Sequence, residues 1–91
     1  MQDKKELKFY LDFGLTIVMK APDHRPPHVH AFQQRGKEDL IIIETQKVQN
    51  SPGNLTRKQL RICQHWIREN KEILMHKWNQ LERMGLISIS S

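Results

Sequence analysis

The sequence predicts an α+β domain in which a small antiparallel sheet of three to four strands precedes a long or bent amphipathic C-terminal helix. Two observations predict this arrangement. As far as residue 49 the apolar residues alternate or form short β-type runs, whereas from Thr56 onward they recur about every 3.6 residues. Between the two patterns, residues 50–55 are rich in Asn, Ser, Pro and Gly, which are typical of loops. A chain of 91 residues has room for a single domain.

Alternating apolar residues predict the first strands of the sheet. Residues 1–8 are mostly charged, and we expect them to be a solvated lead-in. In residues 13–20 apolar side chains take alternate positions, with Phe13 on the same face as Leu15, which predicts a strand. A second strand is predicted from about His28 to Gln34. The sheet is therefore placed within about residues 13–49.

The second half of the sheet is shorter and more apolar. Arg35-Gly36-Lys37 predicts a hairpin turn. Residues 40–43 form a run rich in isoleucine, which is typical of a central strand buried on both faces. Residues 47–49 predict only a weak last strand, because Val48 is their one good β former.

The helical segment is predicted at about residues 56–85. Thr56 suits an N-cap and Gly85 a C-terminal stop. A straight helix of this length would measure about 45 Å at ~1.5 Å per residue, whereas a compact chain of this size is roughly 30 Å across. We therefore expect a bend at Asn70, which has poor helix propensity. Beyond the helix, residues 86–90 alternate and are compatible with an added edge strand.

The predicted helix is apolar on one side and basic on the other. On a helical wheel one broad face carries Leu60, Ile62, Cys63, Trp66, Ile67, Ile73, Leu74, Trp78, Leu81 and Met84. The opposite face carries a basic row, formed by Arg57, Arg61, Arg68 and Lys71.

Three of the five histidines lie in one short segment that runs from Asp23 to His30 and also holds two of the four prolines. Proline restricts its own backbone and that of the preceding residue, so we expect this loop to be rigid. If a strand begins near Pro27, alternation places His28 and His30 side by side on one face.

Three interpretations of this histidine cluster stay open. The histidines can be loop residues with satisfied hydrogen bonds. They can provide acid and base catalysis, with Arg25 holding a phosphate oxygen. They can also bind a metal ion through His24, His28 and His30, with Asp23 as a further ligand.

The composition limits the partners and the compartment. The net charge is +5 with a pI of about 9.7, and most of the excess lies in residues 56–85. Such a basic region attracts nucleic acid or an acidic protein. The sequence has no apolar run of roughly 20 residues and no signal-peptide pattern, so we expect a cytoplasmic protein with no membrane partner. The single Cys63 agrees with this, and we expect it to serve packing.

Residues 13–84 resemble a small, mostly bacterial family, the domain of unknown function 4160. The resemblance depends on Ile17-Val18-Met19, on the signature Asp23-His24-Arg25-Pro26-Pro27-His28-Val29-His30-Ala31, and on a basic helix that carries Trp66 and Trp78. It implies a toxin-like protein, because such proteins are commonly encoded beside a member of the domain of unknown function 2442. The implied partner is a small acidic antitoxin-like protein.

These observations lead to three functional hypotheses. In the first, the protein is a toxin that acts on RNA, with His24, Arg25, His28 and His30 as catalytic residues and the basic row on the phosphates. In the second, it is a non-enzymatic module that binds an acidic protein or nucleic acid. In the third, the histidine cluster binds a metal. The first hypothesis needs no cofactor, and the oligomeric state stays open.

Overall fold

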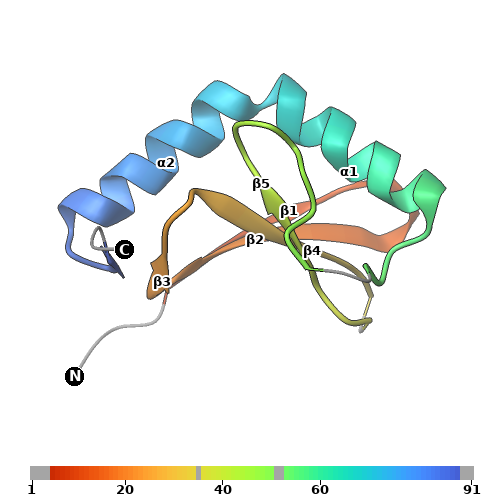
Figure 1. Ribbon diagram of the computed structural model, residues 1–91, viewed down its shortest axis with the longest axis horizontal. Helices are drawn as coiled ribbons and strands as arrows, with labels where there is room; N and C mark the ends of the chain where they lie inside the picture. The colour runs from red at the N-terminus through yellow and green to blue at the C-terminus, as the bar shows by residue number, and fades with distance from the viewer. Residues whose placement is uncertain (1–4, 35, 51–52, 89–91) are drawn as a thin grey trace.

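The computed structural model describes residues 5–34, 36–50 and 53–88. These residues form the α+β arrangement that the sequence predicts, with a four-stranded antiparallel sheet followed by two helices. The helices run one after the other across one face of the sheet (Figure 1). Apolar side chains of both layers meet in a common core that includes Ile17, Val29, Ile67 and Trp78.

The sheet has the strand order β1-β2-β4-β5, and each neighbouring pair is antiparallel. Its strands are β1 Lys5–Tyr10, β2 Leu15–Ala21, β4 His28–Gln33 and β5 Asp39–Ile42. All five residues from Leu15 to Met19 are buried. Strand β2 is therefore the central apolar strand of the domain.

Strand β1 corrects the prediction that residues 1–8 are a solvated lead-in. Residues 5–10 pair along their whole length with β2, while residues 1–4 lie outside the described residues. Leu7 and Phe9 pack on the core, and the residues between and beside them are exposed. The sheet therefore begins at Lys5 and not near residue 13. Leu7 and Phe9 stand among charged residues and are a weak strand signal. Pairing with β2 supplies the stabilisation that the local sequence does not provide.

The segment between β1 and β2 also differs from the prediction. Phe13 does not share a strand face with Leu15 but belongs to a short 3-10 turn, η1 Asp12–Gly14, where its φ is +64°. Its side chain is 70% exposed. The reversal between two paired strands requires this turn, so β2 starts two residues later than the alternation indicates.

The later part of the sheet follows the prediction in part. Strand β5 lies at the isoleucine-rich run, but the prediction of a central strand buried on both faces is wrong, because β5 is the last strand in the sheet order and Leu40 and Ile42 are only partly buried. The turn after β4 includes Gln34, which has a φ of +51°, whereas Arg35 lies outside the described residues. The predicted weak strand at residues 47–49 is reduced to one bridge between Val48 and Ile41. Of the predicted loop, Ser51 and Pro52 also lie outside the described residues.

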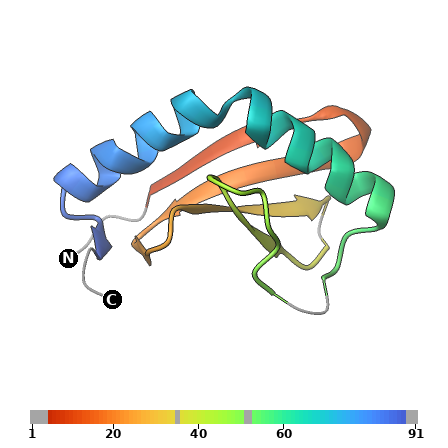
Figure 2. The same cartoon turned by 45° about the horizontal axis from the view of Figure 1, so that its top comes forward.

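The helical segment is divided at Asn70, as predicted, into α1 Arg57–Glu69 and α2 Lys71–Arg83 (Figure 2). Thr56 forms the N-cap, and its hydroxyl accepts a hydrogen bond from the Gln59 N–H while the Gln59 side chain accepts from the Thr56 N–H. The Asn70 side chain donates to the carbonyl of Trp66 at 2.9 Å. Gly85 follows the last turn with a φ of +75°. The longest dimension of the domain is 36 Å, which a straight helix of about 45 Å would exceed.

The break at Asn70 shifts the buried face of α2. Leu74, Trp78 and Leu81 are buried, but Ile73 and Met84, which the wheel places on the apolar face, are more than half exposed. A continuous wheel cannot represent two helices with different axes. Cys63 is buried in the core, as predicted. Among the described residues, no helix has the length and apolar character needed to cross a membrane.

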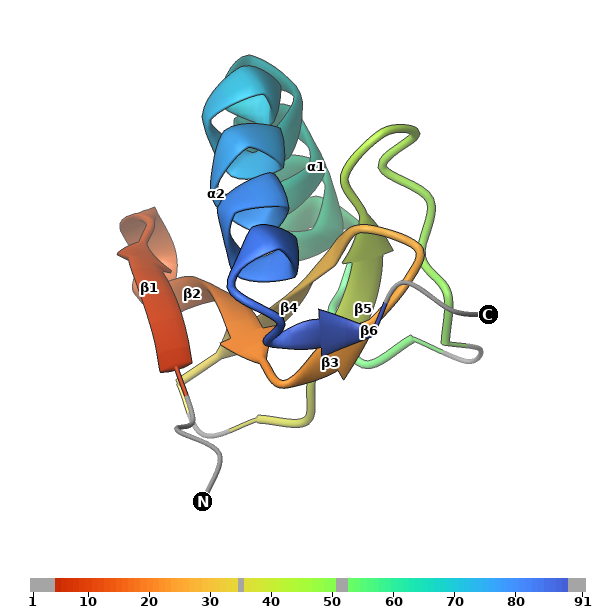
Figure 3. The same cartoon turned by 90° about the vertical axis from the view of Figure 1, so that its left-hand side faces the viewer.

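A second, two-stranded sheet joins the C-terminal segment to the histidine loop, by which we mean residues 23–30. Strand β3, Asp23–His24, pairs in parallel with β6, Ile87–Ser88 (Figure 3). The sequence is compatible with an edge strand at residues 86–90, and residues 89 and 90 lie outside the described residues. Ile87 is buried, so this pairing fixes Asp23 and His24 to the end of α2.

Candidate functional site

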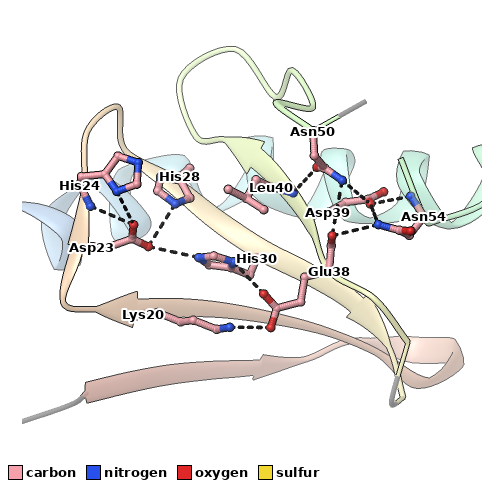
Figure 4. Close-up of polar contacts among 10 residues, drawn as sticks. All are labelled: Lys20, Asp23, His24, His28, His30, Glu38, Asp39, Leu40, Asn50 and Asn54. Atoms are coloured by element: carbon pink, nitrogen blue, oxygen red, sulfur yellow. Dashed lines mark hydrogen bonds and ion pairs between the residues drawn. The ribbon is translucent and has the colours of Figure 1, made fainter. Parts of the chain in front are cut away.

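Asp23, His28 and His30 converge at the end of the sheet, and we call these three residues the triad (Figure 4). Oδ2 of Asp23 lies 3.1 Å from Nε2 of His28 and 3.1 Å from Nε2 of His30. The two imidazole rings are 5.1 Å apart between centroids, which confirms that alternation along the strand places them side by side. One ligand atom of each residue can be chosen so that all three lie within 4.8 Å of one another.

The carboxylate of Asp23 is oriented by its own loop. Its Oδ1 accepts a hydrogen bond from the backbone N–H of His24 at 2.8 Å, so Oδ2 is turned toward the two rings. The parallel pairing of β3 with β6 holds the backbone at the same place. The triad therefore depends on contacts between β3, β4 and the C-terminal strand.

The hydrogen bonds of His28 leave one ring nitrogen without a partner. Its Nδ1 lies 2.7 Å from the carbonyl oxygen of Pro26, and because a carbonyl only accepts, Nδ1 must carry the proton. In the neutral ring Nε2 then presents a lone pair. Nε2 makes no hydrogen bond although Oδ2 of Asp23 is 3.1 Å away, and the side chain is only 1% exposed. A buried polar atom without a partner requires an explanation.

His30 lies between two carboxylates. Its Nε2 forms a hydrogen bond with Oδ2 of Asp23 at 3.1 Å, and its Nδ1 forms one with Oε2 of Glu38 at 3.0 Å. Lys20 donates to the other oxygen of Glu38 at 2.5 Å. Burial raises the pKa of Glu38, but the hydrogen bonds and charges of Lys20 and His30 outweigh it and hold the pKa below its ordinary value. Glu38 therefore stays ionised and orients the His30 ring.

The donor set of the triad suits a divalent transition metal. Two imidazoles and one carboxylate are the donor types found at mononuclear iron sites, and a similar set serves zinc. The three ligand atoms lie within 4.8 Å of one another, so the triad would present all of them to a single ion. Each histidine also uses its other nitrogen on an oxygen acceptor, as metal-bound histidines do.

His24 and Arg25 lie beside the triad but outside it. His24 is exposed, and its Nδ1 is 3.3 Å from Oδ1 of Asp23. Arg25 forms a two-pronged ion pair with Glu82, with Nε donating at 2.6 Å and Nη2 at 3.0 Å. The group of convergent ligands among the described residues thus contains Asp23 and not His24.

The basic row begins on α1 with Arg57, Arg61 and Arg68 and ends at Lys71, the first residue of α2. Arg57, Arg61 and Arg68 are exposed, while Lys71 pairs with Glu44 at 2.9 Å. The triad contacts α2 instead, because the ring of His28 lies 5.5 Å from the ring of Trp78. The helical rise between Arg57 and Trp78 is roughly 30 Å at ~1.5 Å per residue, and the bend makes the direct distance between them shorter. The start of the row therefore lies far from the triad, whereas its last residue, Lys71, pairs with Glu44, two positions beyond Ile42, the strand partner of His28.

Four residues around the triad are absent from the sequence prediction of the site: Lys20, Glu38, Trp78 and Glu82. A signal existed for Lys20, because Val18 pairs with His30 and a residue two positions along a strand points to the same face. Glu38 and Glu82 are brought to the site by pairing and packing over longer distances, which no local pattern records.

The family model described as a domain of unknown function, DUF4160, matches residues 14–79, which is most of the chain. The protein belongs to the DUF4160 family. This membership confirms the resemblance seen in the sequence, and the triad, Arg25 and Trp78 lie inside the DUF4160 match. No curated protein and no solved structure matches the chain.

Proposed function

We propose that this DUF4160 protein holds a divalent transition metal at Asp23, His28 and His30 and uses it to hydrolyse phosphodiester bonds in RNA, as the toxin-like member of a pair with a small acidic protein. The observation that carries the proposal is the buried Nε2 of His28, which has a carboxylate oxygen nearby and no hydrogen bond. A cation bound between Nε2 of His28 and Oδ2 of Asp23 would give both atoms a shared partner.

The alternative to a cation at this place is a proton on Nε2 of His28. An imidazolium Nε2–H would need Oδ2 of Asp23 along its N–H direction, yet the contact does not have the geometry of a hydrogen bond. Two ligand atoms of one ion lie close together without pointing at each other, and this holds for Nε2 of His28 and Oδ2 of Asp23, whereas Nε2 of His30 has hydrogen-bond geometry to that oxygen. The geometry therefore favours a metal ion over a proton at His28.

The residues around the triad suit hydrolysis. A divalent ion held by Asp23, His28 and His30 would supply Lewis-acid chemistry, activating a water for attack on the phosphorus and polarising a phosphoryl oxygen. His24 is exposed and its Nδ1 lies 3.3 Å from Oδ1 of Asp23, so its imidazole is the accessible acid-base group beside the triad and is assigned the transfer of a proton to the leaving oxygen. The side chain of His28 is too deeply buried to meet a substrate, which leaves it the role of ligand.

The charges support RNA as the substrate. The protein carries a net charge of +5. Within the described part of the chain, the ion pairs do not involve Arg57, Arg61 or Arg68, so these side chains are free to contact phosphates. The same surface suits the proposed acidic partner, which would compete with RNA for it.

The metal proposal is tested on protein purified without a nickel column and without a histidine tag. After chelation and dialysis, Zn²⁺, Mn²⁺ or Fe²⁺ is added, and bound metal is measured by calorimetry and elemental analysis. We expect one ion per chain, with at least a hundredfold weaker binding in Asp23→Ala and in His30→Ala. His76→Ala, which removes an exposed histidine of α2, is the matched control. Substoichiometric binding by the wild type, or equal binding by the triad variants, would refute the metal centre.

Hydrolysis is tested separately with single-stranded and structured RNA. We expect cleavage that chelation abolishes, that the added metal restores, and that Asp23→Ala lacks. Expression of the wild type should slow bacterial growth, and co-expression of an acidic partner should relieve it. RNA binding without cleavage in the metal-loaded protein would favour the non-enzymatic binding module instead.

A further inference from the structure

We propose that Arg25, Asn79 and Arg83 form a phosphate-binding subsite beside the triad, which holds the backbone of a single-stranded RNA. This inference rests on the proposed function, because it names the part of the protein that positions the substrate. The subsite is separate from the basic row and uses two residues of α2 that the sequence does not single out.

An open hollow of about 700 Å³ lies between the histidine loop and the end of α2. It is lined by Arg25, Asn79, Glu82 and Arg83. Arg25 comes from the loop, and the other three residues follow one another on adjacent turns of α2. Asn79 and Arg83 are exposed, so their polar groups are accessible from solvent. The hollow thus combines two guanidinium groups with an amide that can donate.

Glu82 holds Arg25 in one orientation. Nε and Nη2 of Arg25 donate to the two oxygens of Glu82. Trp78 also holds this carboxylate, because its indole N–H donates at 3.1 Å to Oε2, the oxygen that accepts from Nε of Arg25. The two-pronged ion pair of Arg25 with Glu82, which we call the fork, uses one edge of the guanidinium and leaves Nη1 available to donate to a ligand. A preoriented guanidinium loses less entropy when it binds a phosphate than a freely rotating one.

The charge of the hollow suits a phosphodiester. The hydrogen bond from Arg25 lowers the pKa of Glu82, burial raises it and Trp78 lowers it, with the result below the ordinary value. Glu82 is therefore ionised and offsets one of the two arginines. One unit of positive charge remains among these side chains, which matches the single negative charge of a backbone phosphate.

Trp78 connects the hollow to the triad. Its ring packs on the ring of His28 at 5.5 Å, while its N–H supports Glu82. Along the chain, Arg25 follows the ligand Asp23 by two residues, with the exposed His24 between them. The same short segment therefore carries a triad residue, an exposed histidine and the loop arginine of the hollow.

The test measures the affinity for a short single-stranded RNA with a fluorescent label, in metal-loaded and metal-free protein. We expect Arg83→Gln to weaken binding about tenfold and Arg25→Lys, which keeps the charge but loses the fork, by a similar factor. Lys58→Gln is the control, since it removes an exposed charge from α1 outside the hollow, and we expect less than a twofold change. Inorganic phosphate should bind the wild type at least tenfold more weakly than RNA does.

The outcomes separate the subsite from the metal centre. If Arg83→Gln and Arg25→Lys bind RNA as Lys58→Gln does, the subsite is refuted, even when the triad binds metal normally. If both arginine variants weaken RNA binding while the wild type binds no metal, the subsite stands and the metal centre fails. Arg83 takes no part in the pair with Glu82, so its variant also excludes loss of loop structure as the cause. Tighter binding of inorganic phosphate than of RNA would overturn the assignment to a nucleic-acid backbone.

Discussion

Oε2 of Glu38 lies 3.0 Å from Nδ1 of His30, on the opposite side of the ring from Asp23. The same imidazole is therefore held between a carboxylate that can bind metal and one that orients it. Carboxylates in this outer position raise the basicity of a histidine ligand and fix its ring. The geometry of the triad thus depends on Glu38 although Glu38 is not one of its ligands.

The first prediction concerns this outer carboxylate. Glu38→Gln should weaken metal binding by about 10- to 100-fold while leaving the stoichiometry at one ion per chain. The change keeps the shape of the side chain but removes the charge that orients His30. Calorimetric titration of the chelated protein measures the effect. Glu72→Gln, at an exposed position of α2, is the matched control, and an equal affinity in both variants would contradict the role of Glu38.

The second prediction concerns Asp39, which anchors the loop before α1. The side chain is 1% exposed and accepts hydrogen bonds from Asn50, Asn54 and the Leu55 N–H. In Asp39→Asn an amide NH₂ group replaces one carboxylate oxygen and faces N–H groups of the loop, so donors meet donors. We therefore expect a loss of about 2 kcal/mol in the free energy of unfolding. Denaturant titration at neutral pH measures it. A change below about 0.5 kcal/mol would show that the loop rearranges around the amide.

The third prediction is the pH dependence of this anchor. Burial raises the pKa of Asp39, but the hydrogen bonds from Leu55, Asn50 and Asn54 outweigh it and hold the pKa below its ordinary value. A folded-state pKa below the unfolded value means that the stabilisation is complete above the unfolded pKa of about 4 and is lost as the pH falls through the folded pKa. The difference in unfolding free energy between wild type and Asp39→Asn should therefore shrink under acid conditions. A constant difference from neutral pH to about pH 2 would contradict this.

The fourth prediction concerns the start of α1. Thr56→Ala removes the hydroxyl that accepts from the Gln59 N–H, and it should lower the free energy of unfolding by about 1 kcal/mol. Metal binding should not change, because the cap lies at the end of the helical segment opposite the triad. Thermal unfolding monitored by circular dichroism provides the measurement. Thr56→Ser keeps the hydroxyl and should restore most of the loss.

The fifth prediction concerns Cys63. Burial, with a smaller contribution from Asp39, raises the pKa of its thiol to about 11. Little thiolate is present at neutral pH, and the sulfur is enclosed in the core, so alkylation of the native protein should be at least a hundredfold slower than that of the unfolded chain. Mass spectrometry after timed treatment with iodoacetamide measures both rates. Equal rates would show that the core opens readily around α1.

Local interactions explain the parts of the fold that were predictable. The Thr56 cap, the break at Asn70 and the stop at Gly85 each depend on contacts within three or four residues, so their chemistry is visible in the sequence. The same holds for the neighbouring rings of His28 and His30, because a strand returns to the same face every second residue. Strand β1 was missed because its stability comes from pairing with β2 and not from its own composition.

The amino-acid sequence by itself determined the α+β class, the course of the divided helix and the density of histidines beside two prolines. Only the tertiary structure decided which side chains surround those histidines. Arg25 meets Glu82 across 57 positions of the chain, and Asp23 is held by a strand that ends the described residues. Contacts over such separations form when chain entropy is overcome by the packing of whole elements, so no short pattern of residues can specify them.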